Sequence, residues 1–139
     1  MNISKKAEYA VRAVIAIARH KQNKPLQISE ISETESIPIK FLEQILLSLK
    51  NNGILKSKRG ANGGYLLAKS GSQISIGMIL EIIDGPFDPV GIKSGNNLGA
   101  GLEKCFGDMV NMVNEHLNEF KIQQVIEIEK PKDLLAFEI

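Results

Sequence analysis

Apolar residues in the first third of the chain recur at steps of three and four residues, the period of helices with one buried face. The first stripe predicts an amphipathic helix ending near His20, and residues 28–34 predict a short second helix. Ser36 and Pro38 supply a capping residue and a first-turn proline for a third helix, which Asn52-Gly53 ends. The apolar stripe of this third helix consists of Phe41, Leu42, Ile45, Leu46 and Leu49.

The pattern changes after residue 53. Ile54 and Leu55 open a predicted strand that runs into a basic stretch, and residues 65–67 predict the returning strand. Gly63 and Gly64 lie between them, where positive φ is expected in the turn. Three helices followed by a two-stranded hairpin is the order of a winged helix-turn-helix. The fold is therefore predicted to be mainly α, with residues 1–84 as a DNA-binding domain that ends in a further short helix.

A long helix is predicted over about 98–118, after a glycine-rich loop at 85–101. Its apolar stripe runs at steps of four and three residues through Leu102, Phe106, Met109, Val113, Leu117 and Phe120. Such a stripe is too apolar to stay exposed, so a second subunit is the expected cover. Residues 98–139 are thus predicted to form a dimerisation helix and a C-terminal tail, with a short helix over 122–128 and a docked apolar end at 134–139.

Composition limits the class of protein. At 139 residues and 43% hydrophobic content the chain can bury one ordinary core. No apolar run is long enough to span a bilayer, no signal segment is recognisable, and a single cysteine excludes an intrachain disulfide. A cytoplasmic protein without a membrane partner is expected. No nucleophile–base pair or acidic cluster is found, so no enzymatic role is predicted.

Charge is distributed unevenly along the chain. The net charge of +1 alone argues against a nucleic-acid partner. However, residues 1–60 hold 11 Lys and Arg against 5 Asp and Glu, whereas residues 61–139 hold 6 against 11. Such asymmetry is expected when only one part of a protein contacts phosphate. Chance scatter is the alternative explanation.

The basic stretch itself, residues 56–67, reads KSKRGANGGYLL and allows two interpretations. A mononucleotide phosphate loop would follow a buried strand and lead into a helix that begins with Gly-Lys-Ser/Thr. That triplet is missing here, and the residues after the glycines read as a strand. The pattern therefore favours a basic hairpin whose tip contacts nucleic acid.

A family resemblance rests on three stretches: KKAEYAVRAVIAIA, QISEISETESIPIKFLEQILLSLKNNGIL and KSKRGANGGYLL. In this order and spacing they resemble the IscR/NsrR/CymR family of bacterial winged-helix regulators (the Rrf-two family), closely over residues 1–84 and in outline beyond. The resemblance implies a homodimeric transcription regulator, expected to repress from a palindromic operator in double-stranded DNA. A winged-helix protein-interaction module without DNA binding is the alternative.

The resemblance assigns base reading to Lys40, Glu43 and Gln44 on the third helix. Their chemistry suits guanine or phosphate, a cytosine amino group, and adenine respectively. Lys40 stands where the family often has a small polar residue, which leaves room for a different operator. A merely solvated helix face is the alternative for Glu43 and Gln44.

The hairpin would add further contacts to the DNA. Arg59 matches the family's minor-groove arginine, and a narrow A·T-rich groove would attract it. Lys56, Ser57 and Lys58 would at best contact the DNA backbone, and Gly60 is also predicted to belong to the DNA-binding residues of the hairpin. Tyr65, like Phe41, is predicted to lie in the core rather than to stack on bases.

Cluster-binding members of the family carry three cysteines in the loop before the long helix. Here that loop, 85–101, has none, and one thiolate, Cys105, cannot replace the four ligands that a cluster usually takes. Glu8 lies near the position of an extra ligand in some relatives, but it has no cysteines to join. No cofactor and no metal are therefore expected.

Cys105 is also a candidate redox switch. Cys105, Met109, Met112 and His116 are 4, 3 and 4 residues apart, so they could share one helix face as soft ligands for Cu(I). Packing in a dimer core is the alternative for the methionines. The effector stays open between a small molecule in the cleft beside the long helix, a partner enzyme, and oxidation of Cys105.

Overall fold

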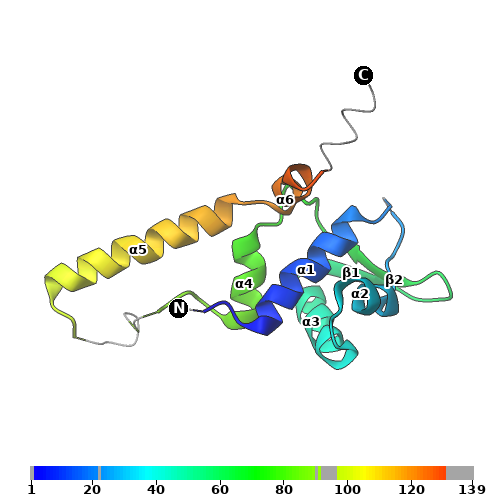
Figure 1. The fold of residues 1–139 in the computed structure, drawn as a ribbon, viewed down its shortest axis with the longest axis horizontal. Coiled ribbons are helices and arrows are strands. Elements are labelled where there is room, and N and C mark those ends of the chain that lie inside the picture. Colours follow the sequence, from blue (N-terminus) through cyan, green and yellow to red (C-terminus); the bar gives the residue numbers. More distant parts are fainter. Residues whose placement is uncertain (1, 22, 90, 92–96, 131–139) are drawn as a thin grey trace, which may run out of the picture.

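A computed structural model describes residues 2–21, 23–89, 91 and 97–130. The elements follow the predicted order, and Figure 1 shows a domain of short helices and a hairpin from which one long helix projects. They are α1 (Lys5–Arg19), α2 (Ile28–Glu35), α3 (Ile39–Asn51), β1 (Leu55–Lys58), β2 (Gly64–Leu67), α4 (Ile76–Asp84), α5 (Ala100–Glu119) and α6 (Ile122–Ile128). This order confirms the mainly α, winged helix-turn-helix fold.

The first helix lies at the centre of the domain. Its N-cap is Ser4, whose Oγ accepts a hydrogen bond from the Ala7 N–H at 3.0 Å. The buried face consists of Ala7, Ala10, Ala13, Val14 and Ile17. Small residues along this face let neighbouring helices approach closely, and α1 contacts α2, α3, α4, α6 and β2.

The turn between α2 and α3 differs from the prediction. Ser36 does not cap α3; it ends α2 in the left-handed region, with φ +54° and its N–H bonded to the Ser32 carbonyl. The Ser32 hydroxyl also donates to the carbonyl of Ile37, which is buried in the turn. These bonds hold Ser36 and Ile37 in a non-helical turn. The helix α3 therefore begins only after Pro38, whose carbonyl accepts a hydrogen bond from the Leu42 N–H at 3.0 Å.

Four of the five apolar residues predicted for the buried face of α3 are fully buried: Leu42, Ile45, Leu46 and Leu49. The prediction was wrong for Phe41, which is 50% exposed. Its ring lies beside that of Tyr9 on α1, with centroids 6.5 Å apart. Phe41 falls at the edge of the apolar arc, so it covers α1 instead of entering the core.

The hairpin pairs β1 and β2 antiparallel, with Leu55 opposite Leu67 and Lys58 opposite Gly64. Leu26 adds a bridge on the outer edge of β2, since its N–H and C=O both bond to Tyr65 at 2.9 Å. Tyr65 packs against the core, as predicted.

The two turn glycines play different parts. Gly64 has φ +142°, and a Cβ there would overlap the Leu26 carbonyl. Gly63 was wrongly expected to have positive φ; glycine is needed there because a Cβ would overlap the Lys58 carbonyl.

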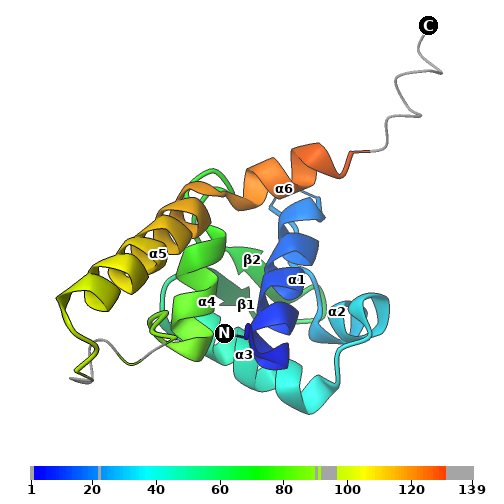
Figure 2. The same ribbon diagram turned by 60° about the vertical axis from the view of Figure 1, so that its left-hand side comes forward.

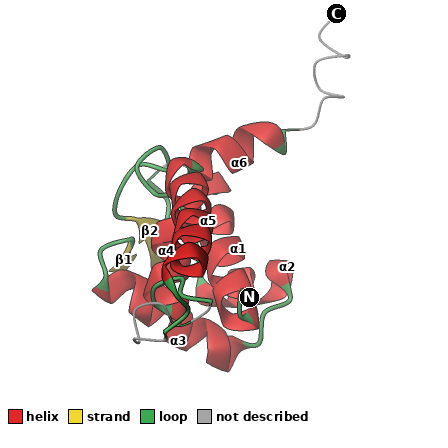
Figure 3. Ribbon diagram, turned by 90° about the vertical axis from the view of Figure 1, so that its left-hand side faces the viewer, coloured by secondary structure: helices red, strands yellow, loops and turns green. Residues whose placement is uncertain are grey.

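The long helix α5 forms an arm: its N-terminal end is free of the domain, and the helix runs back to the domain at its C-terminal end (Figure 1). Seen from its free end, α5 points toward the viewer (Figure 3). Its C-terminal end meets the start of α4, where the Ile76 N–H bonds to the Phe120 carbonyl and the Ile122 N–H to the Ile74 carbonyl, both at 2.9 Å. Ile122 is fully buried, and α6 packs against α1 (Figure 2). The predicted apolar end at 134–139 lies outside the described residues.

Candidate nucleic-acid interface

The outward face of α3 carries the three predicted base-reading residues. Lys40, Glu43 and Gln44 are all exposed, on the side of the helix opposite its buried stripe. Within the described part of the chain, none of the three side chains makes a hydrogen bond or an ion pair. Their side chains are therefore available to a ligand.

Leu47 lies on this same face, and the sequence analysis missed it. It is 54% exposed, one turn beyond Gln44 and two turns beyond Lys40. The signal was present in the sequence, because Leu47 falls outside the spacing of Leu42, Ile45, Leu46 and Leu49. A large apolar side chain in the middle of a polar face is more informative than a scattered exposed one.

Contacts from α1 hold the helix-turn-helix in position. Arg12 is directed at the end of α2: its guanidinium donates to the Glu35 carbonyl, and its Nε lies 3.5 Å from Glu35 Oε1. The cations of Lys5 and Arg12 lie 5.3 and 5.9 Å from the centroid of the Tyr9 ring, which also contacts Phe41. These contacts fix α1 relative to both α2 and α3.

The hairpin presents its cations to solvent. Leu55 is buried, but Lys56 and Lys58 on β1 and Arg59 and Gly60 in the loop are exposed. The loop is braced by a Gly63 N–H to Gly60 carbonyl bond at 2.9 Å and by the Gln27 amide, which donates to the Ala61 carbonyl at 3.3 Å. In Figure 1 this loop projects from the side of the domain opposite the arm.

The recognition face and the basic hairpin belong to one packed unit. α3 contacts β1, and both contribute side chains to the same core cluster. The sequence could predict each element separately. Their arrangement, which gives two exposed surfaces a fixed relation to one another, comes from the packing.

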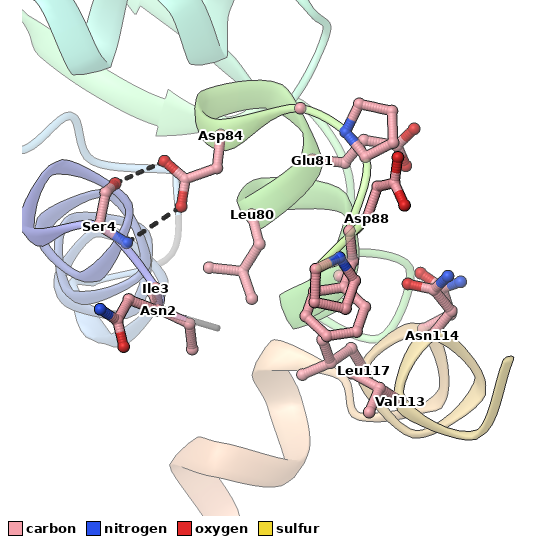
Figure 4. Close-up of a pocket in the computed structure, with 16 residues that line it drawn as sticks. Asn2, Ile3, Ser4, Leu80, Glu81, Asp84, Asp88, Val113, Asn114 and Leu117 are labelled. Atoms are coloured by element: carbon pink, nitrogen blue, oxygen red, sulfur yellow. Dashed lines mark hydrogen bonds between the residues drawn. The ribbon is translucent and has the colours of Figure 1, made fainter. Parts of the chain in front are cut away.

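The predicted dimerisation stripe is divided by the fold. No residue of α5 is buried, and Leu102 is 52% exposed near its free end. Phe106 and Met109 are partly exposed on the same part of the arm. Val113 and Leu117, in contrast, line a cavity against α4 of their own chain (Figure 4).

The four soft-ligand candidates lie along one side of α5. Cys105 and Met112 are exposed, and the ring of His116 packs edge-on against Phe120 with centroids 5.7 Å apart. Cys105 and His116 are 11 residues apart, which at 1.5 Å per residue is about 16 Å along the helix. All four side chains therefore cannot bind one metal ion within a single chain. No group of three or more His, Cys, Asp or Glu with metal-binding geometry occurs among the described residues.

Glu8 is engaged locally. Its carboxylate lies 2.9 Å from Lys5 Nζ on the exposed side of α1. A hydrogen bond from Lys5, together with the charge of that lysine, lowers the pKa of the Glu8 carboxyl. The Glu8 carboxylate therefore forms an ion pair with Lys5 on the surface of α1.

Within the described ranges, no helix is long and apolar enough to cross a membrane.

Comparison with known proteins places these features in a family. The Rrf2 (Rrf-two) family, described as "Iron-dependent Transcriptional regulator", matches residues 3–128. The HTH-type transcriptional regulator IscR of Pectobacterium carotovorum is 30% identical over 131 residues, covering 91% of this chain and 79% of that relative.

Solved structures agree with the family match. The global cysteine regulator CymR (YrzC) of B. subtilis superimposes with a TM-score of 0.84 at 26% identity, over 94% of this chain and 99% of that one. T. potens IscR shares the fold, with a TM-score of 0.79 at 24% identity over 94% of this chain and 89% of that one. With its helix-turn-helix, basic hairpin and projecting arm, the chain belongs to the Rrf2 family of transcriptional regulators.

Proposed function

We propose that the protein is a homodimeric DNA-binding regulator that represses transcription by occupying a palindromic operator. The observation that carries this proposal is the packing of an exposed, unpaired polar face of α3 in one unit with an exposed basic hairpin. A helix of this kind enters the major groove, and a hairpin beside it reaches the flanking backbone or minor groove. The family of the chain supports the same reading.

Base recognition is assigned to the outward face of α3. Gln44 can make a bidentate contact to adenine, Glu43 can accept from a cytosine amino group, and Lys40 can donate to guanine or to phosphate. Leu47 adds an apolar group to this face, and its chemistry suits the methyl group of thymine.

The hairpin is assigned to the flanking DNA. Arg59 at its tip is a planar cation suited to a narrow minor groove. Lys56 and Lys58 lie on one exposed strand and would contact phosphates, while Gly60 allows the backbone to approach closely.

Dimerisation is assigned to the free part of the arm. Leu102 is half-exposed, and Phe106 and Met109 remain partly exposed on the same part of the arm. A second copy of α5 would cover them, whereas Val113 and Leu117 face the cavity against α4 of their own chain. Twofold symmetry then places two copies of α3 on two half-sites.

The protein is proposed to work without an iron–sulfur cluster, although the family is described as iron-dependent. Cysteine thiolates are the usual ligands of such clusters. This chain has one cysteine, which lies exposed on the arm, so its residues do not fit the group.

The test is selection of bound duplexes from genomic DNA, followed by titration of the best site over a salt series. We expect a palindromic consensus, one dimer per site, and an affinity that falls steeply as salt rises, because cations released from phosphate drive binding. A promoter carrying the site should be silenced by the protein. If only weak binding without sequence preference is found, the protein is an interaction module instead.

A further inference from the structure

A cavity of about 740 Å³ lies between the arm and the domain (Figure 4). Its walls come from the segment before α1, from α4 with the residues that follow it, and from the C-terminal half of α5. The volume is within the range of about 300–1,000 Å³ that is typical of small-molecule sites. Its apolar surface is supplied by Ile3, Leu80, Phe87, Val113 and Leu117.

The charged residues among the described lining of the cavity are all acidic. Glu81, Asp84 and Asp88 line the cavity, and no Lys, Arg or His is among its described lining residues. The carboxylate of Asp84 accepts hydrogen bonds from the backbone N–H and hydroxyl of Ser4, which closes one side. The side-chain carboxylate of Glu81 makes no hydrogen bond or ion pair in the described part of the chain. Asn114 and Asn118 add polar groups from α5.

We propose that this cavity is an effector site for a small organic cation with an apolar body, such as an alkyl or aryl amine. Glu81 would receive the ammonium group, because it is the lining carboxylate without a partner in the described chain. Leu80, Val113 and Leu117 would cover the apolar body. A negatively charged compound of the same shape would be repelled by the carboxylates that line the cavity, so it should bind much more weakly.

A ligand in the cavity would change the position of the DNA-binding surfaces in the dimer, and this part of the proposal rests on the proposed function. α4 packs against α1 and α3, whereas α5 carries the proposed dimer contact. The two helices touch closely at Gly77, where a Cβ would overlap the side chain of Asn118. A ligand between them would set the angle of the arm about this contact, and hence the separation of the two copies of α3.

The first experiment measures binding by the full chain in the absence of DNA. Phenethylammonium is the probe and 3-phenylpropionate its anionic counterpart, both titrated to about 10 mM with NMR detection. We expect saturable shifts around Gly77, Glu81 and Asn114 with the amine alone. Glu81→Gln should weaken binding about fivefold, as for a partly exposed ion pair. Glu115→Gln, an exposed carboxylate on α5 outside the cavity, should have no effect.

Several outcomes would overturn the site. Equal binding of both ions would remove the charge argument. A lack of binding by phenethylammonium and by linear alkylammonium ions would show that the cavity is closed, for example by a second copy of the chain. Equal affinity of the wild type and Glu81→Gln would remove the assigned contact.

The second experiment titrates operator DNA with and without phenethylammonium. We expect at least a twofold change in affinity for the wild type, and a smaller one for Glu81→Gln at the same amine concentration. An unchanged affinity at saturating amine would show that the site is not regulatory. The first experiment contains no DNA, so its result does not depend on DNA binding. If the protein fails to bind DNA, the proposed function is wrong but the cation site is unaffected.

Discussion

At the residue scale, the cations of the hairpin differ in what they can contribute to DNA binding. Arg59 is at the tip and has a planar guanidinium, whereas Lys58 lies on β1, where it pairs with Gly64. We expect Arg59→Ala to cost about 1–3 kcal/mol of operator binding and to relax the preference for A·T-rich flanks. Affinity measured on duplexes with varied flanks checks this.

Lys58→Ala is the matched control for Arg59. It should weaken binding to all sequences alike and reduce the salt slope by about one, because it removes a phosphate contact only. If the two variants lose affinity equally, or neither loses any, the hairpin tip does not enter DNA.

Gly64 is required by both its conformation and its neighbours. Its φ of +142° disfavours a β-branched residue, and a Cβ would overlap the Leu26 carbonyl. We expect Gly64→Val to lower the free energy of unfolding by at least about 1–3 kcal/mol. Ala61→Val in the exposed loop should change it by less than about 0.5 kcal/mol. Denaturant unfolding distinguishes them, and equal stability of the two variants would contradict the Leu26–Tyr65 bridge.

At the element scale, the arm is predicted to be the dimer contact. The mass of the chain is 15.3 kDa, so sedimentation of the wild type should give about twice this value. Met109→Glu puts a charge into the proposed seam and should weaken dimerisation about tenfold or more, with a parallel loss of operator binding.

Asn111→Glu gives the control for the arm. Asn111 is exposed on α5 away from the apolar stripe, so the same new charge should leave the dimer intact. A wild type that sediments as a folded monomer at micromolar concentration would rule out this assignment of α5.

The last helix, α6, is expected to stabilise the whole domain. Ile122 is fully buried, whereas Ile128 at the other end of α6 is 69% exposed. We expect Ile122→Ala to reduce the free energy of unfolding by about 2–5 kcal/mol through the cavity it leaves. Ile128→Ala should change it by about 0.5 kcal/mol or less. Urea unfolding of both variants is the measurement; equal effects would mean that α6 does not belong to the core.

At the scale of the whole molecule, the DNA-binding elements fall in the basic part of the chain and the arm in the acidic part. This division keeps the cations of α3 and the hairpin on the domain, while the arm carries the proposed dimer stripe and one wall of the cavity. A signal is therefore expected to act through the position of the arm rather than through a cofactor at the DNA-binding surface.

We accordingly expect no iron–sulfur cluster after anaerobic reconstitution with iron and sulfide. A stoichiometric absorption band at roughly 400–450 nm would contradict this, since thiolate-ligated clusters absorb there. Cys105→Ser should leave operator affinity unchanged under reducing conditions. If this variant loses a response to peroxide that the wild type shows, the thiol is a redox switch.

The sequence by itself determined the order of the elements, most of the buried faces, the uneven charge and the presence of a single cysteine. Periodicity records burial directly, because a residue on the core side of a helix recurs every three or four positions. Charge and cysteine content are properties of composition, so no fold is needed to read them. Because periodicity records burial, Leu47 could also have been recognised from the sequence as lying off the apolar stripe of α3.

Only the tertiary structure decided which distant segments meet. Periodicity is local, so it could not show that Leu26 pairs with Tyr65, that Phe41 packs on Tyr9 outside the core, or that Ile122 returns to the start of α4. The division of the α5 stripe has the same cause: Val113 and Leu117 face a cavity because α4 lies opposite them. Contacts of this kind depend on the path of the chain between the two segments, which the spacing of apolar residues does not encode.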